Sequence, residues 1–91
     1  MTEVAVFVRV AGRVQGVAFR AWTRETARKL GVRGWVENCA DGSVAAHLEG
    51  REEAVQAMLA AMHEGPRHAA VHGLETEPSE PVGCAGFEIL R

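Results

Sequence analysis

Residues 3–30 read EVAVFVRVAGRVQGVAFRAWTRETARKL, and along them the spacing of apolar residues changes from alternating to helical. Over Glu3–Ala11 the valines occupy every second position, which is typical of a β-strand. Over Ala18–Leu30 the apolar and small residues recur at helical spacing between charged residues, which indicates an amphipathic helix. The segment Gly12–Val17 between them contains two glycines and predicts a loop.

The rest of the chain shows the same two kinds of apolar spacing, alternating in strands and helical in helices. They predict, in order, a strand over Val32–Cys39, a strand over Ser43–Glu49, a helix over Arg51–His63, a weaker strand over His68–Thr76, a turn over Glu77–Pro81 and a last strand over Cys84–Leu90. Ala40-Asp41-Gly42 carries the Asp-Gly signal of a hairpin turn, so the second and third strands should pair antiparallel.

The order β-α-β-β-α-β indicates an α+β fold. We expect a ferredoxin-like split βαβ sandwich, in which two helices cover one face of an antiparallel sheet. Residues 1–91 contain no repeat or linker and are treated as a single domain. We also expect the first and third elements to be neighbours, which would place the end of the second strand near the loop Gly12–Val17.

Charge and hydropathy favour a small anionic substrate over a polymer or a membrane. The net charge is −2, but residues 1–33 hold seven Arg and Lys against two Glu, whereas residues 34–91 hold three Arg against ten acids. No apolar run approaches the ~20 residues of a membrane span, and the N-terminus lacks the pattern of a secretory signal. We expect a cytoplasmic monomer that binds neither nucleic acid nor membrane.

Cysteine and histidine indicate no metal site. We interpret Cys39 and Cys84 as two free thiols, with a disulfide as the alternative. His68 and His72 are four residues apart, which would suit a metal on a helix, but in the expected strand they would lie about 13 Å apart.

The two predicted helices start differently. Glu52 and Glu53 complement the positive end of the second helix dipole, whereas the first helix has no capping side chain and carries Arg20 near its start. A bound anion would explain this pattern, because glycine-curled backbone N–H groups and a guanidinium together suit a phosphate. The alternative is a plain glycine turn with Arg20 in solvent.

Asn38 lies at the end of the second predicted strand, just before the hairpin turn. Its carboxamide donates and accepts hydrogen bonds, so it could hold a water molecule near the first loop. The simpler alternative is turn chemistry, in which the Asn side chain bonds to its own backbone.

Two stretches of the chain resemble the signatures of the acylphosphatase family. The first is GRVQGVAFR over Gly12–Arg20, and the second is GWVEN over Gly34–Asn38, followed at the expected spacings by Gly42, Val44 and Gly50. The similarity extends to the element order and over nearly the whole length. One departure is Cys39, where family members often have Thr; this affects support around the site and leaves the catalytic positions intact.

The resemblance implies a hydrolase that splits a carboxyl-phosphate anhydride into a carboxylate and inorganic phosphate, with no cofactor or metal. Arg20 would bind the phosphate and Asn38 would position the attacking water, so these are the expected catalytic residues. The phosphate-binding loop would supply backbone N–H groups from Arg13, Val14, Gln15, Gly16 and Val17. Positioning and charge stabilisation would carry most of the rate.

Two other functions fit the predicted fold. A ferredoxin-like RNA-binding module would need sheet-face aromatics and a positive net charge, whereas this chain has no Tyr and is acidic overall. The alternative that stays open is a non-catalytic or regulatory domain that binds an acyl or carbamoyl phosphate, resembling the domain at the front of the large hydrogenase-maturation carbamoyltransferases.

Overall fold

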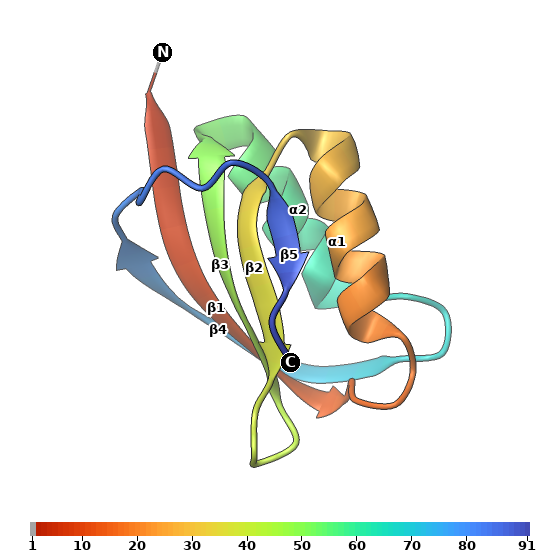
Figure 1. Ribbon diagram of the computed structural model, residues 1–91. Coiled ribbons are helices and arrows are strands. Elements are labelled where there is room, and N and C mark those ends of the chain that lie inside the picture. Colours follow the sequence, from red (N-terminus) through yellow and green to blue (C-terminus); the bar gives the residue numbers. More distant parts are fainter. Residues whose placement is uncertain (1) are drawn as a thin grey trace.

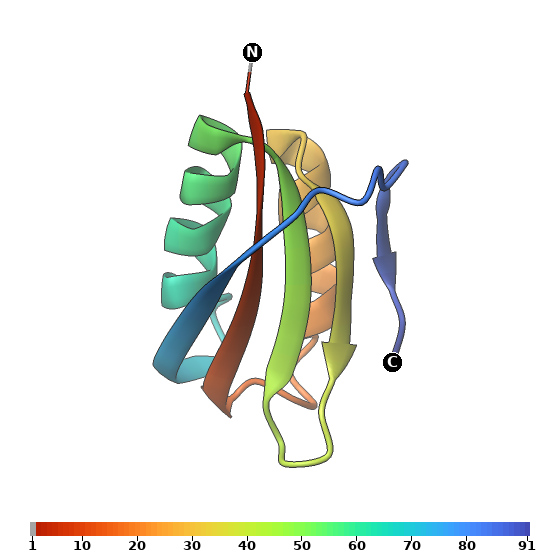
Figure 2. The ribbon, with the colours of Figure 1, turned by 90° about the vertical axis from the view of Figure 1, so that its left-hand side faces the viewer.

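Five strands form one sheet in the computed structural model, which describes residues 2–91. Figure 1 shows the elements in chain order: β1 (Glu3–Arg13), α1 (Phe19–Leu30), β2 (Arg33–Asn38), β3 (Val44–Arg51), α2 (Glu52–Glu64), β4 (Ala70–Ser79) and β5 (Phe87–Ile89). The strands lie in the order β4-β1-β3-β2-β5, with both helices on one face (Figures 1 and 2). The predicted ferredoxin-like α+β fold is confirmed.

The sheet differs from the prediction at one edge. β1 pairs antiparallel with β3 and β4, and β2 pairs antiparallel with β3, but β2 and β5 run parallel. The parallel pair arises because the chain leaves β4 at one edge, crosses the open sheet face and enters β5 beside the start of β2 (Figure 2). The expectation that the first and third elements are neighbours is wrong, because β3 lies between β1 and β2.

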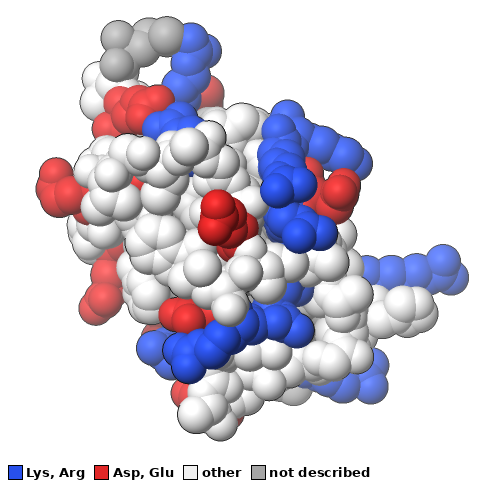
Figure 3. Space-filling model, in the orientation of Figure 1, with Lys and Arg blue, Asp and Glu red and all other residues white. Residues whose placement is uncertain are grey.

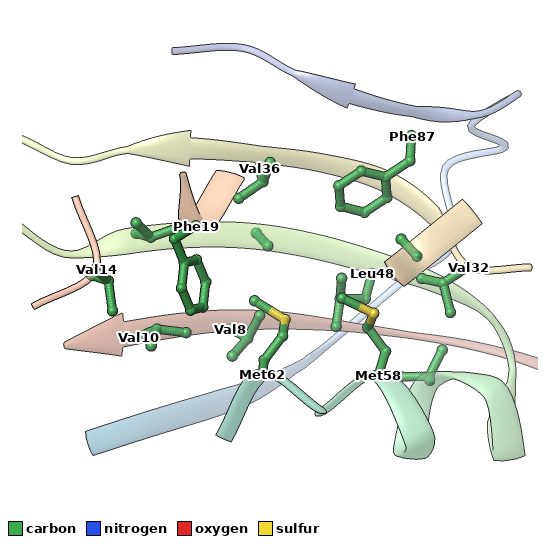
Figure 4. Packing of buried hydrophobic residues seen from close by; sticks show 14 residues of the cluster. Val8, Val10, Val14, Phe19, Val32, Val36, Leu48, Met58, Met62 and Phe87 are labelled. Atoms are coloured by element: carbon green, nitrogen blue, oxygen red, sulfur yellow. The ribbon is translucent and has the colours of Figure 1, made fainter. Parts of the chain in front are cut away.

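Apolar side chains from both helices and the covered face of the sheet form the core (Figure 4). Its labelled members are Val8, Val10, Val14, Phe19, Val32, Val36, Leu48, Met58, Met62 and Phe87. Full burial of a side chain of this size stabilises the fold by roughly 1.5–3 kcal/mol. The core therefore fixes α1 against the sheet and, with it, the loop that leads into α1. Neither described helix combines the length and hydropathy that a bilayer-spanning helix needs.

A β-bulge at the end of β1 directs the chain into that loop. The pairing of β1 with β4 shifts register between Ala11 and Gly12, and Gly12 has a φ of +129°. A Cβ at this position would collide with the carbonyl oxygen of Ala70. Glycine is therefore required here for both conformation and space, and the first glycine of the predicted loop is part of the strand.

A buried carboxylate holds the crossover segment, residues 80–86, against the open face of the sheet (Figure 1). Glu49 of β3 accepts hydrogen bonds from the backbone N–H groups of Val82, Gly83 and Cys84 at 2.9, 3.1 and 3.0 Å. His47 Nε2 lies 2.8 Å from the same carboxylate. Of the predicted strand Cys84–Leu90, β5 contains Phe87–Ile89, and the N–H group of Cys84 at its start is bound to Glu49 instead of to a neighbouring strand.

The charge of Glu49 contributes to stability in a pH-dependent way. Burial alone would raise its pKa, but the hydrogen bonds from His47 and the three backbone N–H groups outweigh burial and hold the pKa at about 2, below the usual 4.5. Arg33, 3.5 Å from one carboxylate oxygen, adds a further positive charge. A carboxyl with a depressed pKa stabilises the folded state above its unfolded pKa and loses this contribution as the pH falls.

Replacement of Glu49 by Gln should lower the free energy of unfolding by about 3 kcal/mol, because an amide NH₂ would face backbone donors. Urea unfolding at pH 7 measures this, with Glu88→Gln on exposed β5 as the matched control, expected within about 0.5 kcal/mol of the wild type.

The wild type should also lose stability between pH 4.5 and pH 2, and Glu49→Gln should lose less. Equal stability of Glu49→Gln and the wild type would contradict the anchoring role.

Candidate active site

The loop between β1 and α1, residues 14–18, starts the helix in an unusual conformation. Val14 and Phe19 at its two ends are buried in the core (Figure 4). Gly16 has a φ of 77°, and Ala18, the N-cap of α1, has a φ of 62° and makes no side-chain cap hydrogen bond. Within residues 2–91, no protein atom accepts a hydrogen bond from the backbone N–H groups of residues 15–18. These donors are available to an external acceptor.

Arg20 adds a guanidinium beside these donors. The first turn of α1 contains no acidic residue, whereas α2 starts with Glu52 and Glu53. Arg20 is half-buried and forms no ion pair or side-chain hydrogen bond with the part of the chain that the structure describes. It lines a hollow of about 190 Å³ together with Val14, Gly16, Ala18, Phe19, Ala21 and Ile89. The helix dipole, the free N–H groups and the guanidinium all favour an anion there.

Basic side chains are present near α1 on the face that Figure 3 shows. Several lie on the right of the view with acidic side chains beside them, a second basic group crosses the lower part of the molecule, and further acidic side chains lie on the left and in the centre. Basic side chains near α1 would attract an anionic ligand toward this side.

Asn38, the last residue of β2, has an unsatisfied side-chain oxygen. Its backbone N–H donates to the carbonyl oxygen of Arg91 at 2.7 Å. Its side-chain Oδ1 is buried and has no hydrogen-bond partner among residues 2–91. The following turn is closed instead by Asp41, which accepts from the Ser43 N–H at 2.9 Å, so the Asn38 side chain does not serve the turn. Because a buried oxygen without a partner costs about 1–3 kcal/mol, binding of a water molecule at this atom is favourable.

One side chain joins the loop to the turn that follows Asn38. Gln15 Nε2 donates to the carbonyl oxygens of Cys39 and Ser43, both at 2.8 Å. Although β3 separates β1 from β2, this contact brings the two predicted parts of the site together. Gln15 therefore reaches the turn through its side chain, and its backbone N–H stays available to a ligand.

The other predicted loop residues do not present side chains to the hollow as binding groups. Arg13 is exposed and its guanidinium donates to the carbonyl oxygen of His68 at 3.4 Å, while Val14 and Val17 pack against the core. Val14 and Val17 therefore offer a phosphate only backbone N–H groups, and Arg13 does not line the hollow. The sequence interpretation missed Ile89, which lines the hollow, and Arg91, which binds the Asn38 N–H. Only the crossover places these C-terminal residues here, and no local sequence pattern indicates it.

The cysteines and histidines do not form a second reactive site. Cys39 and Cys84 are both free thiols, and burial, followed by the Glu49 carboxylate, raises the pKa of Cys84 above its ordinary value. His47, Glu49 and Cys84 bring three potential ligand atoms within 4.8 Å of one another. A cation there would have to displace the backbone N–H groups bound to Glu49 and tolerate nearby Arg33, so the cluster acts as an anchor for the crossover.

Known proteins resemble the chain over almost its whole length. The family model described as Acylphosphatase matches residues 6–89. A protein named Acylphosphatase from Rhizobium etli is 54% identical over 76 residues, which cover 84% of this chain and 81% of that protein. Another of the same name from Thermococcus kodakarensis is 46% identical over 90 residues, 99% of each chain. The crystal structure of acylphosphatase from Bacillus subtilis matches with a TM-score of 0.93 and 34% identity, covering 97% of this chain and 99% of that one.

Replacement of Ala18 by Gly should raise the free energy of unfolding by about 1 kcal/mol, because glycine adopts the left-handed N-cap conformation without strain. The matched control is Ala21→Gly, three residues further into α1, which should lower it by about 1 kcal/mol. Urea unfolding midpoints measure both variants. Destabilisation by Ala18→Gly as large as by Ala21→Gly would show that the helix start is not strained.

Proposed function

The chain belongs to the acylphosphatase family of hydrolases that act on acyl phosphates, and we propose that Arg20 and Asn38 perform this reaction at the start of α1. The observation that carries the proposal is that one hollow is lined both by loop 14–18, whose backbone N–H groups at 15–18 have no acceptor among residues 2–91, and by Arg20, whose guanidinium is unpaired there. The unsatisfied oxygen of Asn38, linked to the same loop through Gln15, supports the second role.

Phosphate binding is the role of Arg20 and the loop. A substrate phosphoryl group would accept hydrogen bonds from the backbone N–H groups of residues 15–18 and from the guanidinium of Arg20. Guanidinium binds two phosphate oxygens through parallel hydrogen bonds, which fixes orientation as well as charge. As the transition state forms, the same donors stabilise charge on the equatorial oxygens.

Water positioning is the role of Asn38. A water held by its Oδ1 attacks phosphorus in line with the leaving group; the new bond joins water oxygen to phosphorus, and the bond from phosphorus to the acyl oxygen breaks. The water's proton passes to a phosphate oxygen, and the electron pair leaves with the carboxylate. Because a carboxylate is a good leaving group, positioning and charge stabilisation suffice, and no covalent enzyme intermediate or cofactor is required.

We also propose that the protein is a cytoplasmic monomer with a single domain over residues 1–91. The proposed site needs only one chain, because Arg20 and Asn38 both come from it. The net charge of −2 favours a small acyl phosphate as partner over nucleic acid.

The alternative, a domain that binds acyl or carbamoyl phosphate without cleaving it, is favoured by no observation. Phosphate release from benzoyl phosphate, beside a phosphomonoester control, separates enzyme from binder.

Replacement of Arg20 by Ala should lower kcat/KM for benzoyl phosphate about 10³-fold and weaken competitive inhibition by inorganic phosphate, because the charged phosphate ligand is lost. The control is Arg51→Ala, the same charge change at the exposed start of α2, which should leave both values unchanged. A Ki for phosphate that Arg20→Ala does not alter would contradict phosphate binding by this residue.

Replacement of Asn38 by Ala should lower kcat about 10²-fold while the Ki for inorganic phosphate changes less than about threefold, because the water loses its ligand and the phosphate does not. Steady-state kinetics with benzoyl phosphate, and phosphate as competitive inhibitor, give both numbers. Full turnover by Asn38→Ala would rule out its role in holding the water.

A further inference from the structure

The carboxamide of Gln15 donates both of its hydrogens to the β2–β3 turn. Its Nε2 lies 2.8 Å from the carbonyl oxygen of Cys39 and 2.8 Å from that of Ser43. The same two carbonyls close the β2–β3 turn, because Cys39 O accepts from the Gly42 N–H at 3.1 Å and Ser43 O accepts from the Cys39 N–H at 2.8 Å. Each carbonyl therefore has both acceptor positions filled, and the planar amide is fixed relative to the turn.

This contact joins the two halves of the site. The turn follows Asn38 directly, while Gln15 belongs to the loop that contributes Val14, Gly16 and Ala18 to the hollow at Arg20. β1 and β2 do not pair directly; they are joined only through β3, whose Val44 pairs with Val10 of β1 on one side and with Asn38 on the other. Among the side-chain hydrogen bonds of residues 2–91, those of Gln15 are the ones that tie loop 14–18 to this turn.

We propose that the Gln15 side chain is a positioning residue that sets the distance between the phosphate-binding loop and the Asn38 carboxamide. The inference rests on the proposed roles of Arg20 and Asn38. In-line attack requires the water on Asn38 and the phosphorus on the loop to keep one geometry, and an error of about 1 Å costs on the order of 10²-fold in rate. Gln15 controls that geometry without touching substrate through its side chain.

A purely structural role for Gln15 would predict different behaviour. If the bridge only stabilised the hairpin, its loss would lower the unfolding midpoint and leave kcat of the folded protein unchanged. If Gln15 acted on the phosphate, its loss would raise the Ki for phosphate in parallel. A positioning role lowers kcat, leaves that Ki nearly unchanged, and disappears when Asn38 is absent.

The test is a double-mutant cycle of Gln15→Met, which keeps the length and removes both donors, with Asn38→Ala. Alone, Gln15→Met should lower kcat for benzoyl phosphate at least about tenfold, with the Ki for inorganic phosphate within about threefold of the wild type. In the Asn38→Ala background the same change should lower kcat less than about threefold. The matched control is Gln56→Met on the exposed face of α2, which should leave kcat and Ki unchanged.

An unchanged kcat in Gln15→Met, an equal loss of kcat with and without Asn38, or a parallel rise in Ki would each overturn the inference. Full activity of Asn38→Ala alone would instead overturn the proposed function, so the two failures are distinguishable. If Gln15→Met does not fold, Gln15→Asn, whose amide is one methylene too short to reach both carbonyls, is measured in the same way and judged by the same outcomes.

Discussion

The start of α1 leaves the N–H groups of residues 15–18 without a protein acceptor and places the guanidinium of Arg20 beside them. A second cluster of backbone N–H donors, at residues 82–84, has an acceptor within the chain. The carboxylate of Glu49 accepts hydrogen bonds from all three of these N–H groups. At α1, no atom of residues 2–91 accepts from the N–H groups of residues 15–18. We propose that the same preference of clustered backbone donors for negative charge stabilises the fold at residues 82–84 and favours a bound phosphate at α1.

The crossover segment, residues 80–86, connects the Glu49 carboxylate to the proposed site at the start of α1. Glu49 holds residues 82–84 on the open face of the sheet, and from there β5 runs parallel to β2 toward the site. At its end, Ile89 lines the hollow at Arg20, and the carbonyl oxygen of Arg91 accepts the Asn38 N–H. With Gln15 reaching the turn from the other side, Asn38 is positioned by two segments that are distant in sequence. Most of the precision of the site comes from these tertiary contacts rather than from the loop itself.

Local patterns were enough to predict the order of the elements and to propose an anion site, because period-two alternation in β1, helical spacing in α1 and the missing cap before Arg20 are all local features. The neighbour relation of β1 and β2 and the parallel pairing and length of β5 were not accessible in this way. They depend on which strand occupies the middle of the sheet and on where Glu49 binds the crossover. The side-chain role of Gln15 was equally hidden, since its partners lie 24 and 28 residues away. The family resemblance indicated which residues to propose for the site, and the structure shows which contacts hold them.

We propose that the loop 14–18 and the first turn of α1 bind a phosphate group. Titration of the ¹⁵N-labelled protein with inorganic phosphate, followed by amide chemical shifts, tests this binding most directly. We expect the amide signals of residues 15–20 to shift most and to saturate together, while those of residues 82–84, already bound to Glu49, stay in place. Saturating shifts at any other segment, with residues 15–20 unmoved, would contradict it.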